Sequence, residues 1–282
     1  MTKSSATYLE KYKNMTDLEW RDLIIQNSRS LNPDPSLPRF PPEHIQKQFV
    51  GGSYDHTMRE AFNFYAYFKN RAEELGQPFA PDSAFLDFGC GWGRFLRLFV
   101  RDFNADNLHG VDVNEHILRI CDSTGVPGNL SQIEPLGHIP LAPRSIDYAM
   151  AYSVFTHLPE PVHLHWLHDL ARVLKPKGLF CFTLQPRRFL DFIERQASEG
   201  VSDWHKALGK FAPQISGFRS HYDSGGFVFL KTLGARPEAE TYGDAIVPLS
   251  YIEKWWSPYF EIVEHIDKPD RFQKAVVLVR RR

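Results

Sequence analysis

A short glycine-rich segment, residues 84–94, constrains the fold of this chain more than any other part of its sequence. An apolar run ends in Asp87, glycines follow at positions 89, 91 and 93, and residues 95–100 are apolar with helical spacing. This order predicts a buried strand, a tight turn and the N-terminus of a helix. Glycine suits such a turn because it tolerates a positive φ and lets a ligand lie against the backbone. The unpaired N–H groups of the helix N-terminus then face the ligand.

The spacing and charge of this segment argue against a dinucleotide site. The fingerprint G-x-G-x-x-G needs its third glycine at position 94, where this chain has Arg94. Asp87 would also repel a pyrophosphate, whereas it would not repel a ligand with an amino group and a sulfonium. The pattern D-x-G-x-G-x-G resembles the first motif of the class I S-adenosylmethionine (SAM) methyltransferases. The resemblance implies SAM as cofactor, bound by Asp87, Gly89, Gly91 and Gly93; the alternative is a purely structural turn.

Three further segments resemble the same family, in the same order along the chain. Residues 108–112 are apolar and end in Asp112, and an acid at the end of a second strand accepts hydrogen bonds from ribose hydroxyls. Residues 145–158 resemble the fourth strand and the loop after it. Residues 170–182 resemble the next helix, a turn and the fifth strand, with Lys-Pro-Lys-Gly where the family usually has Lys-Pro-Gly-Gly. The resemblance implies an α/β fold: a Rossmann-like, seven-stranded, mostly parallel sheet with helices on both faces.

The resemblance also implies further cofactor contacts at the ends of the second, third and fourth strands. The second strand supplies the ribose-binding acid, for which the alternative role is a helix N-cap. The family lines the methionine end of SAM after the fourth strand, where loop packing is the alternative. The residues implied are Asp112, Val113, Ile133, Glu134, Tyr152 and Ser153.

Methyl transfer is an in-line displacement at a carbon that its sulfonium leaving group already activates. The protein therefore supplies mainly approach geometry and exclusion of water, and a base is needed only if the acceptor must lose a proton. His157 follows the fourth strand at the edge of the sheet where ligands bind, so it is the first candidate for a catalytic base. His221, in a segment inserted after the fifth strand, is the second. The alternative for His157 is a histidine that fixes its loop by hydrogen bonds.

Aromatic residues are candidates for the walls of an acceptor pocket, although aromatic residues more often pack in the core. The substrate-binding candidates are Tyr54, Trp92, Tyr222 and Tyr242. Three histidines at 163, 165 and 168 lie on one predicted helix, but at about 100° per residue they do not converge on one face. We therefore expect no metal site there and a solvated helix face.

Residues 1–76 are expected to form an N-terminal extension and helical cap, with Asp55 as the N-cap of a helix that ends at Gly76. Five prolines between 33 and 42 exclude regular structure there. Residues 77–282 are expected to form the SAM-binding methyltransferase domain. Its connection at about 186–248 is too long for an ordinary loop, and we call this segment the lid. Helices are expected at 189–195 and 203–211, strands at 226–230, 260–263 and 275–279, and another helix at 250–259.

The bulk composition restricts the partners of the chain. Its formal net charge of −1 provides no basic field for nucleic acid or anionic membranes. Three separated cysteines without a CxxC pair, no apolar N-terminal segment and no membrane-spanning stretch suggest a cytoplasmic protein. The sequence thus predicts a SAM-dependent methyltransferase acting on an oxygen or nitrogen of a small molecule. The alternatives are a protein or nucleic acid as acceptor, or a non-catalytic SAM-binding protein.

Overall fold

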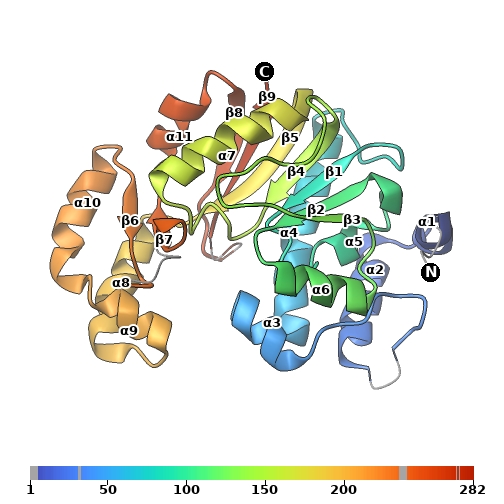
Figure 1. Cartoon of the computed structure of the whole chain (residues 1–282), viewed down its shortest axis with the longest axis horizontal. Coiled ribbons are helices and arrows are strands. Elements are labelled where there is room, and N and C mark those ends of the chain that lie inside the picture. The colour runs from blue at the N-terminus through green and yellow to red at the C-terminus, as the bar shows by residue number, and fades with distance from the viewer. Residues whose placement is uncertain (1–5, 31–32, 235–239, 271, 273) are drawn as a thin grey trace. The chain divides into compact units, whose positions relative to one another are not determined.

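The computed structural model describes residues 6–30, 33–234, 240–270, 272 and 274–282 (Figure 1). Its main sheet has the strand order β3-β2-β1-β4-β5-β9-β8. Strand β1 pairs in parallel with β2 and β4, β2 pairs in parallel with β3, and β9 pairs antiparallel with β5 and β8. This confirms the predicted Rossmann-like, seven-stranded, mostly parallel sheet. The strands are β1 (Phe85–Phe88), β2 (Leu108–Asp112), β3 (Asn129–Gln132), β4 (Ile146–Ala151), β5 (Leu174–Leu184), β8 (Phe260–Ile266) and β9 (Ala275–Arg281).

The chain divides into two compact units. The first consists of the residues up to Glu134 together with Ile139–Met150, and the second of Pro135–His138 together with the residues from Ala151 onwards. The helical elements of the first unit are α1 (Ala6–Tyr12), α2 (Asp17–Arg29), α3 (Glu43–Val50), α4 (Tyr54–Glu74), α5 (Leu96–Phe99), η1 (Ala105–Asn107) and α6 (Glu115–Thr124).

The N-terminal helices of the first unit begin at well-defined caps. Thr16 and Glu19 form a capping box at the start of α2, because each side chain accepts from the other's backbone N–H. Helix α4 has Ser53 as its N-cap, so the prediction of Asp55 was wrong by two residues. Gly76, at φ 73°, follows α4 as predicted. No regular element interrupts the proline-rich residues 33–42.

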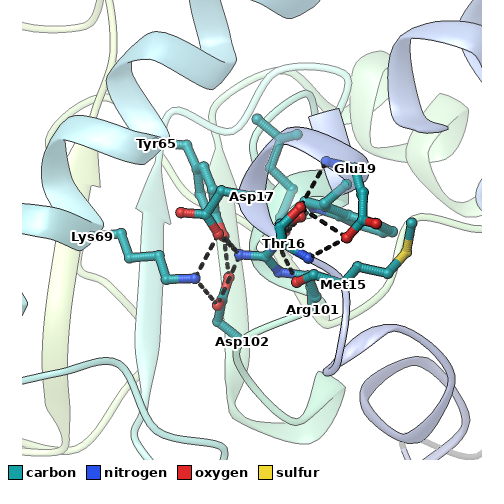
Figure 2. A network of polar contacts seen from close by, with 10 residues as sticks. Met15, Thr16, Asp17, Glu19, Tyr65, Lys69, Arg101 and Asp102 are labelled. Atoms are coloured by element: carbon teal, nitrogen blue, oxygen red, sulfur yellow. Dashed lines mark hydrogen bonds and ion pairs between the residues drawn. The ribbon is translucent and has the colours of Figure 1, made fainter. Parts of the chain in front are cut away.

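A buried network of charges joins α2, α4 and the segment after α5 (Figure 2). Arg101 is 3% exposed and pairs with Asp17 and Asp102. Lys69 Nζ lies 2.9 Å from a carboxylate oxygen of each of the same two aspartates. Tyr65 donates its hydroxyl hydrogen to Asp102. Because each cation meets both carboxylates, the network fixes the N-terminal helices against the rest of the first unit.

The second unit carries the lid and the C-terminal hairpin. Strand β5 runs through the Lys-Pro-Lys-Gly segment, with Lys177 at φ 68°, so the predicted turn before the fifth strand is part of that strand. In the lid, the strand predicted at 226–230 is present as β6 (Val228–Leu230), and η2 (Ala212–Gln214), α10 (Ile215–Asp223) and β7 (Asp244–Ile246) were not predicted. Strand β6 pairs antiparallel with β7. The remaining elements of this unit are α7 (Glu160–Val173), α8 (Arg188–Glu199), α9 (Asp203–Gly209), η2 (Ala212–Gln214), α10 (Ile215–Asp223), β6 (Val228–Leu230), β7 (Asp244–Ile246) and α11 (Leu249–Trp256).

The lid has a hydrophobic core of its own, formed by buried aliphatic residues of α8, α9, α10, β6 and β7. Burial of such side chains contributes roughly 1.5–3 kcal/mol each. The segment is therefore a folded element rather than an irregular loop. Its core residues are Leu190, Ile193, Leu208, Ile215, Val228, Leu230 and Ile246.

Within the described ranges, none of the helices has both the length and the apolar character that crossing a membrane requires.

Candidate functional site

The glycine-rich turn leaves β1 and folds back onto β2. The N–H groups of Gly89 and Cys90 both donate to the carbonyl of Val111, at 2.8 and 3.0 Å. Gly89, Gly91 and Gly93 have φ of 75°, 52° and 73°, a region that residues with a side chain rarely adopt. The predicted tight turn is therefore present, and each of its glycines is needed conformationally.

The helix after the turn is shorter than predicted. Residues 91–95 are in turn conformation, and α5 spans Leu96–Phe99 rather than 95–100. Arg94 thus lies in the turn and not in a helix. Its guanidinium pairs with Glu60 at 3.0 Å and donates to the carbonyl of Thr57, which ties the turn to α4.

Asp112 is held directly beside this turn. Its Oδ2 accepts from the N–H of Gly91 and its Oδ1 from the N–H of Asn114, both at 2.9 Å. Burial nevertheless raises its pKa. The N-cap of α6 is Asn114, whose side chain accepts from Ile117, so the alternative role of Asp112 as an N-cap is wrong. The structure therefore brings together the first and second motifs, as the sequence predicts.

Asp87 is the most unusual group of the first unit. It is 1% exposed, and its buried Oδ2 has no hydrogen-bond partner among the described residues. Burial raises its pKa to about 8, while the nearby positive charge of Arg94 opposes this rise. A buried carboxylate without a donor is costly unless a ligand supplies one. Beside it, a Cβ added to Gly91 would meet no atom within 4 Å, so the turn is open on that side.

The other implied cofactor residues of the first unit follow β2 and β3. Val113 is largely exposed and its carbonyl accepts from Gln132. Ile133 is buried and donates its N–H to the carbonyl of Asp112 at 3.0 Å. Glu134 is exposed. Ile133 thus borders the Asp112 site through the backbone, and the cofactor roles of these three residues stay predictions.

Two aromatic substrate candidates also lie in the first unit. Tyr54 begins α4 at φ 51°, and its N–H donates to Gln46 at 3.0 Å. Trp92 is buried, with its ring 5.9 Å from that of Phe40 and 5.2 Å from the guanidinium of Arg97. The indole of Trp92 therefore packs beneath the proline-rich segment, and the substrate roles of Tyr54 and Trp92 stay predictions.

His157, in the second unit, has a defined tautomer. Its Nδ1 lies 2.7 Å from the carbonyl oxygen of Gly243, which accepts, so Nδ1 carries the hydrogen. The lone pair of Nε2 then points toward Ser153, whose Oγ lies 3.4 Å away. The ring stacks on Tyr242, with centroids 4.7 Å apart and planes 12° apart. This geometry suits a general base, because the accepting nitrogen is free to take a proton.

The electrostatic surroundings of His157 keep it neutral. Burial lowers the pKa of the imidazole, and the positive charge of Lys274 lowers it further. The carboxylate of Asp244 and the carbonyl of Gly243 act in the opposite direction. Asp244 Oδ1 lies 3.7 Å from Nδ1 of His157. A neutral imidazole at pH 7 is the protonation state that a base needs.

Tyr152 and Ser153 follow β4, as predicted, and lie next to His157. Ser153 has φ of 62°, and its N–H donates to Oγ1 of Thr183 at 2.8 Å. Lys274 Nζ lies 5.4 Å from the ring centroid of Tyr152. A strained, hydrogen-bonded backbone at this position is typical of functional loops. The contact of either residue with a cofactor stays a prediction.

The lid candidates have local contacts. His221 is exposed on α10, and its ring lies against Gly226, where an added Cβ would come within 2.3 Å of it. Tyr222 packs against the lid core, and burial raises the pKa of its hydroxyl. The described contacts of His221 do not include His157. The catalytic role of His221 and the substrate role of Tyr222 stay predictions.

The helix with three histidines differs from the prediction. His163 is fully buried, and its Nε2 accepts from the indole N–H of Trp256 at 3.1 Å, so a solvated face was wrong for this residue. Burial lowers its pKa to about 3. His165 donates toward the carbonyl of Gly137 at 2.6 Å. Within the described part of the chain, no group of three potential ligands is placed to hold a metal ion.

Sequence reasoning missed two residues that position His157. Gly243 directly precedes β7 and Asp244 begins it. The N–H of Gly243 also donates to the carbonyl of His157 at 2.9 Å, which holds the loop that carries His157. Asp244 is buried and accepts from Trp204 and Thr232, at 3.1 and 2.7 Å. The sequence signal for Asp244 was an acidic residue followed by three apolar residues in the lid, a pattern too common to identify a site.

Comparison with known proteins identifies the region around the turn. Residues 85–178 match a family model described as a methyltransferase domain. The chain is 24% identical over 180 residues to the trans-aconitate 2-methyltransferase of Azoarcus sp. (strain BH72), which covers 64% of this chain and 62% of that protein. The matched part of this chain therefore spans less than two thirds of the length of this curated relative.

Solved structures share the fold. A S-adenosylmethionine-dependent methyltransferase from Clostridium acetobutylicum superimposes with a TM-score of 0.53 at 14% identity, covering 84% of this chain and 96% of that one. Another from Mesorhizobium loti has a TM-score of 0.50 at 14% identity, covering 75% and 96%. At these identities the likeness concerns the fold alone.

Proposed function

We propose that this chain is a class I SAM-dependent methyltransferase that moves a methyl group from SAM to an oxygen or nitrogen of a small molecule. The observation that carries the proposal is the buried Asp87 carboxylate, whose Oδ2 has no described partner, beside the open face of Gly91. A cationic ligand satisfies such a carboxylate, whereas an anionic one does not. The residues present therefore fit SAM.

The residues of the first unit would bind and orient this cofactor. Bound SAM supplies a methyl group activated by a sulfonium. Asp87 would hold its positive charge, Asp112 would accept from its hydroxyls, and the bare backbone of Gly91 would allow close approach. Because the methyl group is already activated, these residues act chiefly by positioning it.

His157 would take the proton that a hydroxyl or amine acceptor loses. Its Nδ1 is committed to the carbonyl of Gly243, so Nε2 is the atom that receives the proton. Tyr242 holds the plane of the ring, and Asp244 lies close enough to stabilise the imidazolium that forms. Positioned bases of this kind contribute about 10²–10⁴-fold to rate.

Two observations support a small acceptor. The curated relative is named for a methyl transfer to a small molecule, trans-aconitate. The net charge of −1 gives no general attraction for nucleic acid. We therefore place a small molecule ahead of a protein or nucleic acid as acceptor.

Calorimetric titration of the full chain with SAM, with its demethylated product and with NAD tests the cofactor. We expect micromolar binding of the first two and none of NAD. Asp87→Ala and Asp112→Ala should each weaken SAM binding by at least about tenfold, the loss of a charged hydrogen bond. Unchanged SAM affinity in both variants would overturn the cofactor assignment.

Transfer from radiolabelled SAM tests the acceptor class. The enzyme is incubated separately with the ultrafiltered small-molecule fraction of a cell extract, with its proteins and with its nucleic acids. We expect label in the first fraction, reduced by about 100-fold in His157→Asn but not in His221→Asn. Label confined to the macromolecular fractions would reject a small acceptor, and binding of SAM without any transfer would favour a non-catalytic role.

A further inference from the structure

A cavity of about 540 Å³ opens beside α8 in the second unit. Side chains from α8, the neighbouring α9 and the segment before β9 line it, so two distant parts of the sequence meet there. A volume of this size suits a small organic molecule. The lining residues that bear on its ligand are Arg188, Phe189, Phe192, Arg195, Trp204 and Lys274.

Positive charge is in excess on the walls of this cavity. Arg188, Arg195 and Lys274 line it, against the single carboxylate of Asp191. That carboxylate is neutralised from outside, because Arg219 lies 2.7 Å from its Oδ1. Arg188 pairs with Asp267, and Arg195 and Lys274 add two further positive charges to the walls. Such a cavity favours an anionic ligand.

The aromatic side chains of the cavity pack against one another. The rings of Phe189 and Phe192 lie 5.4 Å apart with 26° between their planes, and those of Phe192 and Trp204 lie 5.9 Å apart with 34°. Phe189 and Trp204 are inclined at 33°. Three rings in mutual contact give the cavity an aromatic wall, against which a planar apolar group can pack.

The cavity is connected to the candidate base by direct contacts. The indole N–H of Trp204 donates to Asp244 Oδ2 at 3.1 Å, and Oδ1 of the same carboxylate lies 3.7 Å from His157. Lys274, which also lines the cavity, lies over the ring of Tyr152 at 5.4 Å. Tyr152 and His157 belong to the loop after β4. Two lining residues thus contact the surroundings of His157, Trp204 through Asp244 and Lys274 through Tyr152.

We propose that this cavity binds a small carboxylic acid with a planar apolar body. The carboxylate pairs with Arg195 and Lys274, and the body lies against Phe189, Phe192 and Trp204. The assignment of this acid as the methyl acceptor rests on the proposed function, whereas its binding does not. Arginine matches a planar carboxylate with two parallel N–H donors.

Calorimetric titration of the full chain with cinnamate, with its neutral analogue cinnamyl alcohol and with phenyl phosphate tests the binding. We expect cinnamate to bind at least about tenfold more tightly than either of the others, because only it combines a single carboxylate with a flat body. Weaker binding of cinnamate than of the alcohol would overturn the role of the cations. Tighter binding of phenyl phosphate would overturn the carboxylate assignment.

Variants test whether cinnamate binds in this cavity, and control variants separate the loss of a charge there from a general effect on folding. Arg195→Gln and Lys274→Met should each weaken cinnamate binding by about tenfold, while Lys274→Arg keeps it. Lys210→Met, a charge loss elsewhere in the lid, and Arg119→Gln on α6 are the matched controls and should change it less than about twofold. Equal losses in the controls would overturn the proposal. SAM affinity, measured in Arg195→Gln, is expected to be unchanged, so a failure of the cavity proposal is distinct from a failure of the cofactor assignment.

Discussion

Asp244 Oδ1 lies 3.7 Å from Nδ1 of His157, although His157 follows β4 and Asp244 begins β7. Asp244 is almost completely buried and holds this position through Trp204 and Thr232. The carboxylate therefore faces the imidazole with a fixed geometry. In the proposed mechanism Asp244 is a positioning residue, because it would act through His157 rather than on a substrate.

Asp244→Asn and Lys274→Met should shift the pKa of His157 in opposite directions. The carboxylate of Asp244 raises this pKa and the ammonium of Lys274 lowers it. Removing the carboxylate should therefore lower the pKa of His157, and removing the ammonium should raise it. NMR titration of the histidine ring signals measures both shifts without any acceptor. The acid limb of the transfer rate against pH should move the same way in each variant.

Asparagine retains an oxygen that accepts from Trp204 and Thr232, so Asp244→Asn should keep its fold. Lys210→Met serves as control, since it removes a lid charge outside the cavity. Shifts of the same sign in both variants would contradict the electrostatic account of His157.

Gly91→Ala and Gly125→Ala should have similar effects on stability but different effects on SAM binding. Both glycines have positive φ, 52° and 72°, and a Cβ added to either would meet no atom within 4 Å. The cost is therefore conformational in both, about 1 kcal/mol. Only the methyl group at Gly91 would enter the proposed cofactor site. We expect SAM affinity to fall by at least about tenfold in Gly91→Ala and to be unchanged in Gly125→Ala.

Thermal unfolding and calorimetry on the two variants separate strain from ligand exclusion. If both variants lose SAM binding, backbone strain is the cause of the loss. If both variants keep it, the cofactor binds away from Gly91.

Asp87→Asn should change how the stability of the unliganded protein depends on pH. The pKa of Asp87 is about 8 in the folded chain, against roughly 3.9 when unfolded. Between these values the folded state binds the extra proton, so the contribution of Asp87 to stability is present at low pH and is lost as pH rises through 8. Asparagine does not titrate. The Tm of Asp87→Asn relative to wild type should therefore increase from pH 5 to pH 9, with SAM binding weakened.

Asp106→Asn, on η1 outside the turn, is the control for this experiment. Its Tm difference from wild type should stay nearly constant over the same pH range. A constant difference for Asp87→Asn as well would show that its carboxylate is already ionised in the unliganded protein.

The glycine-rich turn and its contact with Asp112 were predictable because their determinants are local. Asp87 and the glycines at 89, 91 and 93 encode a strand and a turn within a few residues, and Asp112 follows at the end of the next strand. In a parallel sheet these strand ends meet at one edge. The hydrogen bond from Gly91 to Asp112 follows from that topology.

The contacts of His157 and the lining of the cavity were less predictable, because they depend on residues that are distant in the sequence. Gly243 is separated by 86 residues from His157, and no local pattern links the two. His163 has neighbours typical of an exposed helix, yet Trp256 buries it and supplies a hydrogen bond. In both cases tertiary packing decides the environment of a histidine, which periodicity alone does not reveal.

Arg101→Met should destabilise the first unit through the charge network of Figure 2. Asp17 and Asp102 would keep only Lys69 as a cation, and Tyr65 would lose a partner. Removing one charged side chain from a buried network lowers stability by more than its ion pairs contribute, because the opposite charges stay buried without a partner. Allowing for the partial exposure of Asp17, we expect a loss of about 2 kcal/mol, or a fall in Tm of about 4 °C or more.

Arg119→Met is the matched control, because its pair with Glu115 on α6 is 61% exposed on both side chains. Exposed pairs of this kind contribute about 0.5 kcal/mol or less. Added salt should reduce the effect of Arg119→Met and leave that of Arg101→Met nearly unchanged, since buried pairs are weakly screened. Similar Tm losses in the two variants would mean that the network contributes no more than a surface pair. SAM binding in Arg101→Met then shows whether the N-terminal helices also support the turn that holds Asp87.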